Sequence, residues 1–329
     1  MSSELRQDLV SGDWVLIAPG RGKRPDQFKE KAKREKQPKT GCIFENPKQA
    51  GGGLVILSSP NTKAWKLQVV PNKYPAVTQS GIWELHPNKT GPFSTLPGFG
   101  YHELLITRDH HKNFAALSPR DALLVFQAFR ERYMEMAKDK NLAYISIFHN
   151  WGNKAGASVY HPHYQILGIP VVPPDVGHSL EGSRRYRQKH RKCVHCIQIE
   201  WEKKQKSRII FEDKYAIAFM PYVSKEPFEM RVFPKCHRPY FEEMKDGELT
   251  HIVKALQTSL NKLEKALSRP DYNFFLHTSP VRNKKSDSHY HWHIEIVPRT
   301  NISAGFELGT DIEINPLDPD KAASFLNRY

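Results

Sequence analysis

Short stretches of apolar residues, or of alternating apolar and polar residues, recur along the chain and predict β-strands. In the first half they fall at residues 14–18, 66–70, 103–106 and 144–148. Alternation with a period of two is typical of a strand that buries one face. A Ser-Gly-Asp turn precedes the first stretch, so residues 4–20 are predicted to form a hairpin.

The second half repeats this pattern, and two longer stretches show helical periodicity instead. Strands are predicted at residues 207–211, 216–220, 229–233, 273–277 and 289–298. Helices are predicted at residues 118–138 and 246–267. Ser118 and Asp121 support the start of the first helix, because both residue types cap helix N-termini.

The order of these elements indicates an internal duplication. Strand, long helix, strand and a histidine-bearing strand occur twice, ending at His161-Pro-His-Tyr-Gln165 and at His291-Trp-His-Ile-Glu295. Each copy also has a Cys-x-x-(Cys/Glu) sequence upstream. Repeats fix architecture, so we predict an α+β fold of two tandem modules, at residues 1–178 and 179–329. Each module is a mainly antiparallel sheet with one long helix, and together they form one integrated unit.

The composition is that of an ordinary globular protein, with a strong positive charge. Charged residues make up 26% of the 329 residues, and the net charge is +14. Much of the charge lies in residues 29–39, a predicted polar loop, and in residues 184–192. The latter are the basic end of a stretch at residues 171–192 that begins Pro-rich and is predicted to be a linker. The charge favours anionic partners such as nucleotides, sugar phosphates or nucleic acid.

The sequence also indicates where in the cell the protein is expected. No hydrophobic leader follows Met1, and no apolar run approaches roughly 18 residues, so neither secretion nor a membrane span is predicted. Four cysteines in a chain of this length argue against a disulfide scaffold. A cytoplasmic location is therefore expected.

One stretch carries candidate chemistry. A turn of small residues, Gly156 to Ser158, precedes His161, His163 and Gln165. On an extended segment these last three side chains point to the same face. Such a site can hold a phosphate and attack it, because a histidine nucleophile splits one difficult transfer into two easier ones. A lone His-x-His would favour surface or metal-ligand histidines; the small-residue turn and Gln165 favour the nucleophile.

Each copy also contains a candidate metal site. The second set has the Cys2His2 chemistry of tetrahedral Zn²⁺ and consists of Cys193, Cys196, His237 and His291. The first set would be Cys42, Glu45, His110 and His161. A carboxylate can serve as a fourth zinc ligand, but Glu45 could instead cap a turn and leave the first site empty.

These motifs resemble the galactose-1-phosphate uridylyltransferase family, a duplicated branch of the histidine-triad superfamily. The resemblance runs from about Leu5 to Pro316 and rests on the Gly-x-Ser-x-x-His-Pro-His-x-Gln signature. It implies two histidine-triad-like modules, the first catalytic and the second zinc-bearing. The tail, with Gly-Phe-Glu-Leu-Gly-Thr310 and Ile-Asn-Pro316, is closer to the branch that includes ADP-glucose phosphorylases.

The resemblance also assigns roles to particular residues. It implies that His163 is the nucleophile, that Gln165 and Ser158 bind the transferred phosphoryl group, and that His161 is a metal ligand. The remaining substrate contacts that it implies are Asn150 and Gly156 beside that group, Arg21, Arg24 and Asn72 at the nucleotide, and Glu307 at the sugar hydroxyls. In the family the tail reaches into the neighbouring subunit's pocket, which implies a homodimer.

Three positions depart from the family pattern. Glu45 replaces the usual second cysteine, Lys73 stands where some members have an acidic residue, and Glu313 stands where a glutamine binds sugar. The base, the sugar and the acceptor are therefore left open by the sequence.

The predicted activity is transfer of a nucleoside monophosphate between a nucleoside-diphosphate sugar and hexose 1-phosphate, as in the UDP-glucose-dependent uridylyltransferases of galactose metabolism. Gln165 supports transfer over hydrolysis, because an amide cannot protonate a leaving group and a sugar phosphate leaves as a stable anion. An ADP-glucose phosphorylase-type reaction with phosphate as acceptor is one alternative. A histidine-triad hydrolase of adenylylated nucleic acid, suggested by the basic loops, and a non-catalytic zinc scaffold are the others. The expected partners are nucleotide sugar, sugar phosphate and a second copy of the chain rather than nucleic acid.

Overall fold

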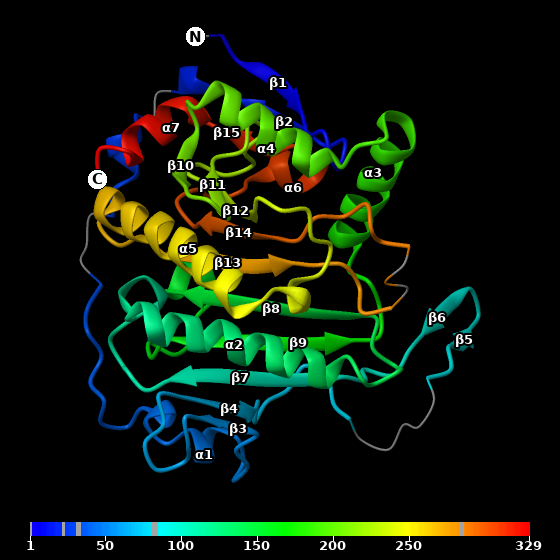
Figure 1. Ribbon diagram of the computed structural model, residues 1–329, viewed down its shortest axis with the longest axis vertical. Helices are drawn as coiled ribbons and strands as arrows, with labels where there is room; N and C mark the ends of the chain where they lie inside the picture. The colour runs from blue at the N-terminus through cyan, green and yellow to red at the C-terminus, as the bar shows by residue number, and fades with distance from the viewer. Residues whose placement is uncertain (1, 22–23, 31–33, 80–84, 283, 285) are drawn as a thin grey trace.

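The computed structural model describes residues 2–21, 24–30, 34–79, 85–282, 284 and 286–329. Its centre is a ten-stranded antiparallel sheet in the order β10-β11-β12-β14-β13-β8-β9-β7-β4-β3 (Figure 1). The first half of the chain supplies β3 (Leu57–Ser59), β4 (Leu67–Pro71), β7 (Tyr101–Thr107), β8 (Tyr144–Trp151) and β9 (His163–Ile169). The second half supplies β10 (Ile209–Glu212), β11 (Ala216–Phe219), β12 (Met230–Pro234), β13 (Tyr272–His277) and β14 (His293–Pro298).

The sheet is built from two five-stranded halves in mirrored order. Reading outward from the middle, the first half runs β8-β9-β7-β4-β3 and the second half runs β13-β14-β12-β11-β10. The halves join where β8 pairs with β13 in an antiparallel register that sets Trp151 opposite Tyr272. The predicted α+β architecture of two similar modules in one unit is confirmed.

Two long helices cover one face of the sheet (Figure 1). They are α2 (Pro119–Met136) and α5 (Asp246–Leu267), which pack against each other as well as on the strands. Ser118 caps α2 as predicted, because its side chain accepts a hydrogen bond from the Asp121 amide. Apolar side chains alternate toward these helices; the buried Tyr164 ring, for example, lies 5.5 Å from the ring of Phe129 on α2. The residues on either side of Tyr164 therefore face away from the helices.

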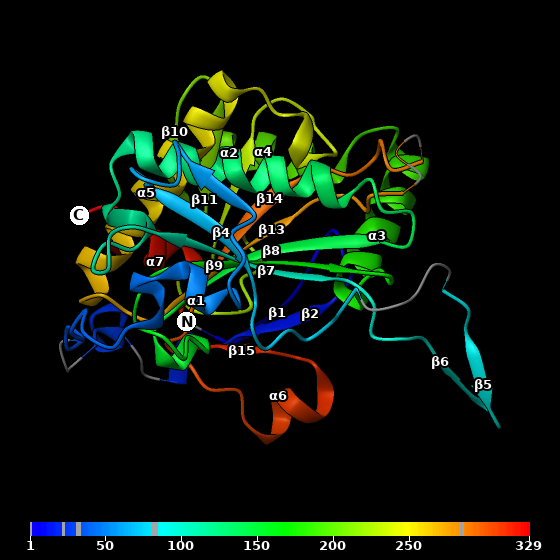
Figure 2. The same cartoon turned by 90° about the horizontal axis from the view of Figure 1, so that it is seen from below.

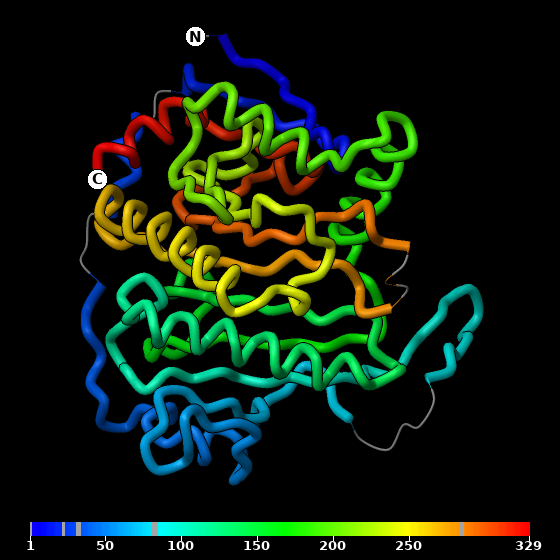
Figure 3. Tube along the Cα trace, viewed as in Figure 1, coloured from blue at the N-terminus to red at the C-terminus, as the bar shows by residue number. Residues whose placement is uncertain are grey.

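The opposite face carries a small three-stranded sheet (Figure 2). Its strands are β1 (Glu4–Gln7), β2 (Trp14–Ile17) and β15 (Ile314–Asn315), so the predicted N-terminal hairpin is present and is extended by the C-terminal tail. Figure 3 shows that this N-terminal segment lies at the same end of the molecule as the C-terminus, beside the second half. Arg6 ties it there through hydrogen bonds to the Tyr222 carbonyl at 2.8 Å and to Asp318 at 2.9 Å.

The stretch predicted to be a linker is helical. Most of residues 171–192 form α3 (Pro174–His190). Proline is tolerated in the first helical turn, so the prolines that suggested a linker start the helix instead. Gly182 lets the hairpin pack closely on α3, because a Cβ there would lie 1.6 Å from the Val10 carbonyl oxygen. Sequence patterns miss such a tertiary contact.

The remaining elements are short. Apart from single 3-10 turns, they are α1 (Pro47–Ala50), α4 (Val194–Gln205), α6 (Gly305–Thr310), α7 (Pro319–Leu326) and the projecting hairpin of β5 (Asn88–Thr90) and β6 (Phe93–Thr95). Residues 31–33 of the predicted polar loop lie outside the described residues; Arg34, just beyond them, packs over Trp151 and pairs with Asp271. Among the helices of the described ranges, none is both long and apolar enough to cross a membrane.

Candidate active site and metal centres

A cavity of about 550 Å³ opens on the face of the sheet away from α2 and α5. His163, Gln165, Ser158 and Asn72 all line it, so four of the predicted site residues meet there. Other lining residues come from the segment before α1 and from the loop after β4, and include Phe44, Lys73 and Tyr74. The predicted common orientation of His163 and Gln165 follows from their alternation around Tyr164 on β9.

The protonation of the His163 ring follows from its backbone contact. Its Nδ1 lies 3.0 Å from the carbonyl oxygen of His161. A carbonyl only accepts, so Nδ1 carries the proton and donates it. Burial lowers the pKa of His163, which favours the neutral ring. In that ring Nε2 bears the lone pair.

The turn before the histidines is held by the second half of the chain. Gly156 has a left-handed φ of +83°, which glycine adopts without a steric penalty. Asn273 of β13 donates hydrogen bonds to the Ala155 carbonyl and to Asn150 Oδ1, both at 2.8 Å. A Cβ at Gly156 would lie 3.9 Å from Asn150 Nδ2, so Asn150 and Gly156 are neighbours. Ser158 is thereby placed at the cavity.

A second histidine supports the backbone at His163. His149 on β8 is fully buried, and its Nδ1 donates to the His163 carbonyl at 2.7 Å. The ring lies against Trp151, Tyr164 and Phe274. This burial lowers the pKa of His149 to about 3, because a charged imidazolium is disfavoured among apolar groups.

The buried His149 makes stability depend on pH. Its folded-state pKa of about 3 lies below the ordinary value of 6.5, so the unfolded chain binds the extra proton between these values. Stability is therefore lost as the pH falls through that window. Between pH 7 and pH 5, this group should remove about 2 kcal/mol from the free energy of unfolding.

Urea unfolding of the wild type and of His149→Asn at both pH values measures this loss. The asparagine side chain keeps a donor near the position of the histidine Nδ1 but does not titrate. The stability of the variant should therefore fall by about 2 kcal/mol less than that of the wild type. An equal fall in both proteins would contradict the assignment.

A third histidine contacts the side chain of Gln165. His102 on β7 places Nε2 2.8 Å from Gln165 Oε1. The backbone amide of Ala76 donates to His102 Nδ1 at 3.0 Å. His102 does not itself line the cavity.

The predicted Cys2His2 set comes together. Atoms of Cys193, Cys196, His237 and His291 that could bind a metal all lie within 4.8 Å of one another. The Nε2 atoms of His237 and His291 donate to the carbonyls of Ser288 and Pro234, at 2.8 and 3.0 Å. The two Nδ1 atoms therefore present lone pairs to the thiols, each 3.6 Å from Cys196 Sγ. This donor set fits a tetrahedral Zn²⁺ ion.

The first set is also assembled. Cys42, His110 and His161 form a second group within 4.8 Å. Both histidines again donate Nε2–H to backbone carbonyls, of Gln37 and Thr107, so their Nδ1 atoms face each other as lone pairs 3.1 Å apart. Glu45 Oε1 lies 3.0 Å from His110 Nδ1 and 3.5 Å from that of His161. Converging lone pairs and a carboxylate repel one another without a cation, so this arrangement also fits a metal.

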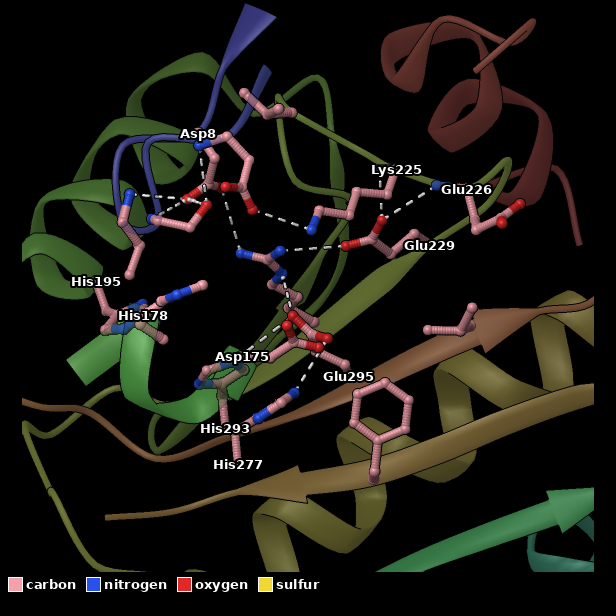
Figure 4. A pocket seen from close by; sticks show the side chains of 18 of the residues that line it. Asp8, Asp175, His178, His195, Lys225, Glu226, Glu229, His277, His293 and Glu295 are labelled. Atoms are coloured by element: carbon pink, nitrogen blue, oxygen red, sulfur yellow. Dashed lines mark hydrogen bonds and ion pairs between the residues drawn. The ribbon is translucent and has the colours of Figure 1, made fainter. Parts of the chain in front are cut away.

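The counterpart of the His163 cavity in the second half is lined by many charged side chains (Figure 4). His293 repeats the ring contact of His163, with Nδ1 3.1 Å from the His291 carbonyl. At the place of Gln165, Glu295 forms an ion pair with Arg231, with 2.9 Å between its Oε1 and Nε, and Glu229 pairs with the same guanidinium at 3.3 Å. The remaining cavity is about 270 Å³. Carboxylates here disfavour a phosphate. His277, His293 and Glu295 also form a further group with metal-binding atom types.

Besides Asn150 and Gly156, which belong to the neighbouring strand and turn, three more predicted substrate residues do not line the His163 cavity. Arg21 and Arg24 are exposed near the end of β2, separated by residues 22–23, which lie outside the described residues. Glu307 is on α6, where it accepts from the Ala304 amide at 3.1 Å. None of the three lines the cavity. Arg21 and Arg24 follow β2 of the small sheet and Glu307 precedes its strand β15, and Figure 2 shows α6 standing out from the body of the molecule beside that sheet.

Sequence reasoning missed His102 and His149. Both lie on strands that flank β9, and each reaches the site across a strand pair. Alternation marks the face on which such a residue lies, but the partner depends on the register between strands.

Comparisons with known proteins identify the family of this chain. A family model described as "Galactose-1-phosphate uridyl transferase, N-terminal domain" matches residues 1–173, and one described as a domain of unknown function (DUF4921) matches residues 98–326. An ADP-glucose phosphorylase of Arabidopsis thaliana is 33% identical over 329 residues, covering 99% of this chain and 92% of that protein. The chain belongs to the galactose-1-phosphate uridylyltransferase family. The resemblance predicted from the sequence is confirmed, and the protein is an enzyme, a nucleotidyltransferase.

Other members of the galactose-1-phosphate uridylyltransferase family match over the same length. The galactose-1-phosphate uridylyltransferase of Thermotoga maritima is 25% identical over 328 residues, covering 97% of this chain and 96% of that protein. The crystal structure of the Arabidopsis thaliana ADP-glucose phosphorylase with bound ADP-glucose superposes with a TM-score of 0.83 at 30% identity, covering 100% of this chain and 99% of that chain. The match therefore includes both halves of the sheet and the tail.

Proposed function

We propose that the protein transfers AMP from ADP-glucose to inorganic phosphate through a nucleotidyl-His163 intermediate. The observation that carries this proposal is the His163 ring, whose Nδ1 donates to the His161 carbonyl and whose Nε2 therefore keeps its lone pair in a ring that lines the cavity. The similarity to ADP-glucose phosphorylase over 99% of the chain, together with the tail sequence, favours this donor and acceptor.

In the first step, His163 Nε2 attacks the α-phosphorus of ADP-glucose. A P–N bond forms, the bond from that phosphorus to the bridging oxygen breaks, and the electron pair leaves on glucose 1-phosphate. The attacking ring gains positive charge, which the His161 carbonyl stabilises by accepting the hydrogen bond from Nδ1–H. A phosphate oxygen then attacks the same phosphorus, ADP leaves, and the neutral ring is restored.

Polar groups around the cavity support this transfer. Gln165 and Ser158 line it and can donate to the equatorial oxygens of the phosphorus, where charge builds up. Lys73 is exposed at the same cavity and adds positive charge near the nucleotide. The leaving glucose 1-phosphate is a stable anion, so the site needs no proton donor there.

Transfer of UMP to hexose 1-phosphate is the second candidate, favoured by the match to the Thermotoga maritima enzyme. Incubation with α-³²P-labelled ADP-glucose or UDP-glucose, followed by precipitation, identifies the nucleotide that labels the protein. We expect acid-labile label from ADP-glucose and its release as ADP by phosphate. Label from UDP-glucose alone, released by galactose 1-phosphate, would show the second candidate instead. The absence of a label from either sugar would exclude both.

In this proposal the two predicted modules have different roles. The described residues that line the cavity around His163 all fall within residues 1–178, and residues 179–329 supply the Cys2His2 group and the tail. Cys193, Cys196, His237 and His291 would hold one Zn²⁺, and Cys42, Glu45, His110 and His161 a second. Bound zinc supplies a structural cross-link. Both groups would fix loops that lead into β9 or β14, and neither would provide a reacting atom.

A homodimer completes this proposal. Arg21, Arg24 and Glu307 are outside the cavity of their own chain. The segment around Glu307 exposes Ile302 and Leu308, at 90% and 75% of their surface. An exposed apolar segment next to substrate-binding residues suits insertion into the His163 cavity of a second copy.

A further inference from the structure

The orientation of the Gln165 side-chain amide in the cavity can be fixed by neighbouring residues outside the cavity. An amide has one accepting end and one donating end, which look alike in outline. A phosphoryl oxygen is anionic, so it is bound only if the NH2 end faces it. The contacts that Gln165 makes on its side away from the cavity can fix which end of the amide faces the phosphoryl group.

His102 is placed to make this selection. In the register of β7 and β9, Leu104 lies opposite Gln165 and His102 lies opposite Leu167. Residues 102 and 104 share a face of β7, so His102 is the diagonal neighbour of Gln165. The contact is His102 Nε2 to Gln165 Oε1 at 2.8 Å.

The backbone decides which nitrogen of His102 carries the proton. The Ala76 amide donates to His102 Nδ1 at 3.0 Å. Nδ1 must therefore be the accepting nitrogen, and in a neutral ring Nε2 then bears the hydrogen. Asn72 Nδ2 lies 3.2 Å from the same Nε2, but it is itself a donor, because Asn72 Oδ1 accepts from the Tyr74 amide. The acceptor for Nε2–H is therefore an oxygen of Gln165.

We infer that His102 is a positioning residue, which holds Gln165 with its carbonyl outward and its NH2 toward the transferred phosphoryl group. The inference rests on the proposed function. A proton-bearing Nε2 accepts no hydrogen bond, so the reversed amide would set two donors against each other and turn its carbonyl toward the phosphate. The chain of contacts runs from the Ala76 amide through the His102 ring to the Gln165 carbonyl, and it ends in two N–H donors at the cavity.

In the second half, different residues occupy the positions of His102 and Gln165. Arg231 is opposite Glu295 in β12 and β14, as Leu104 is opposite Gln165 in β7 and β9. Two positions before Arg231 lies Glu229, at the place of His102. Glu295 and Glu229 both pair with Arg231 (Figure 4). A carboxylate has no donating end, so the corresponding contacts there bind a cation and leave no amide for a phosphate.

Two substitutions of His102 separate this role from a structural one. The amide nitrogen of Gln in His102→Gln takes about the position of Nε2 and can still donate to Gln165. The Asn side chain of His102→Asn takes the position of Nδ1, so it can accept from Ala76 but does not reach Gln165. We expect His102→Gln to keep near-wild-type kcat and His102→Asn to lose about tenfold in kcat with little change in KM.

A double-mutant cycle with Gln165→Met tests the path. If His102 acts through Gln165, then His102→Asn should cost nothing further in a Gln165→Met protein. Equal losses in both backgrounds, or equal kcat for His102→Gln and His102→Asn, would overturn the inference. Labelling of the wild-type protein is measured alongside. Failure of the wild type to form a nucleotide adduct refutes the proposed function, whereas a normal adduct with no effect of His102 refutes only this inference.

Discussion

Replacing His163 with glycine should abolish turnover and covalent labelling. His163 Nε2 is the atom that forms the P–N bond in the proposed reaction, and among the described residues no other imidazole lines that cavity. The rate of sugar phosphate release should fall by about four orders of magnitude or more, which is the scale for loss of a covalent nucleophile. Initial rates and acid-labile label from α-³²P-labelled nucleotide sugar measure it. Retained labelling would show that another side chain is the nucleophile.

The same variant tests whether the site is shared between two chains. Coexpressed with Glu307→Ala, it should form mixed dimers in which one cavity has both His163 and the partner tail intact. Statistical mixing then restores about a quarter of wild-type activity, although each parent dimer is impaired at both cavities. If activity stays at the level of the parents, Glu307 acts within its own chain or not at all. As a control for folding, the His163→Gly variant should unfold at the same urea concentration as the wild type.

Replacing Cys193 with serine should cause the largest loss of stability. Cys193 is 7% exposed and belongs to the group of four metal-binding side chains between α4 and β14. Serine is a weak zinc ligand, and without the ion the lone pair of the fully buried His291 has no cation beside it. We expect the loss of one zinc equivalent per chain and about 4 kcal/mol or more of unfolding free energy.

Cys236→Ser is the matched control. Cys236 is exposed and lies outside both cysteine-histidine groups, so its replacement should change neither zinc content nor stability by more than about 0.5 kcal/mol. Metal analysis of the purified proteins and urea unfolding give both quantities. Equal zinc content in the wild type and in Cys193→Ser would contradict the assignment of the metal site.

The sequence predicted most of the fold because its signals were local. Alternation located the strands of both halves, and helical periodicity with a Ser118 cap located α2 and α5. The motif from Gly156 to Gln165 is contiguous, so its residues could be assigned to one site without a structure. The linker predicted at residues 171–192 was wrong because the burial of Gly182 against Val10 is a tertiary contact.

The parts of the site that were missed depend on contacts between distant segments. His102 meets Gln165, and His149 meets the His163 carbonyl, only in the register of β7, β9 and β8. A shift of one residue would turn either ring to the other face of the sheet. Asn273 reaches the turn at Ala155 from the second half, and no periodicity in either segment indicates that pair.

The pairing of β8 with β13 at the middle of the sheet also limits how the protein can be divided. A cut between the two halves would expose the full backbone of a long inner strand on each fragment, at Tyr144–Trp151 and at Tyr272–His277. Such edges carry unpaired amides and carbonyls flanked by aromatic side chains, and they join to other chains readily. Fragments made separately would therefore be prone to aggregate. The backbone hydrogen bonds between β8 and β13 join the two repeats, and water could replace them only if the core of each repeat became exposed.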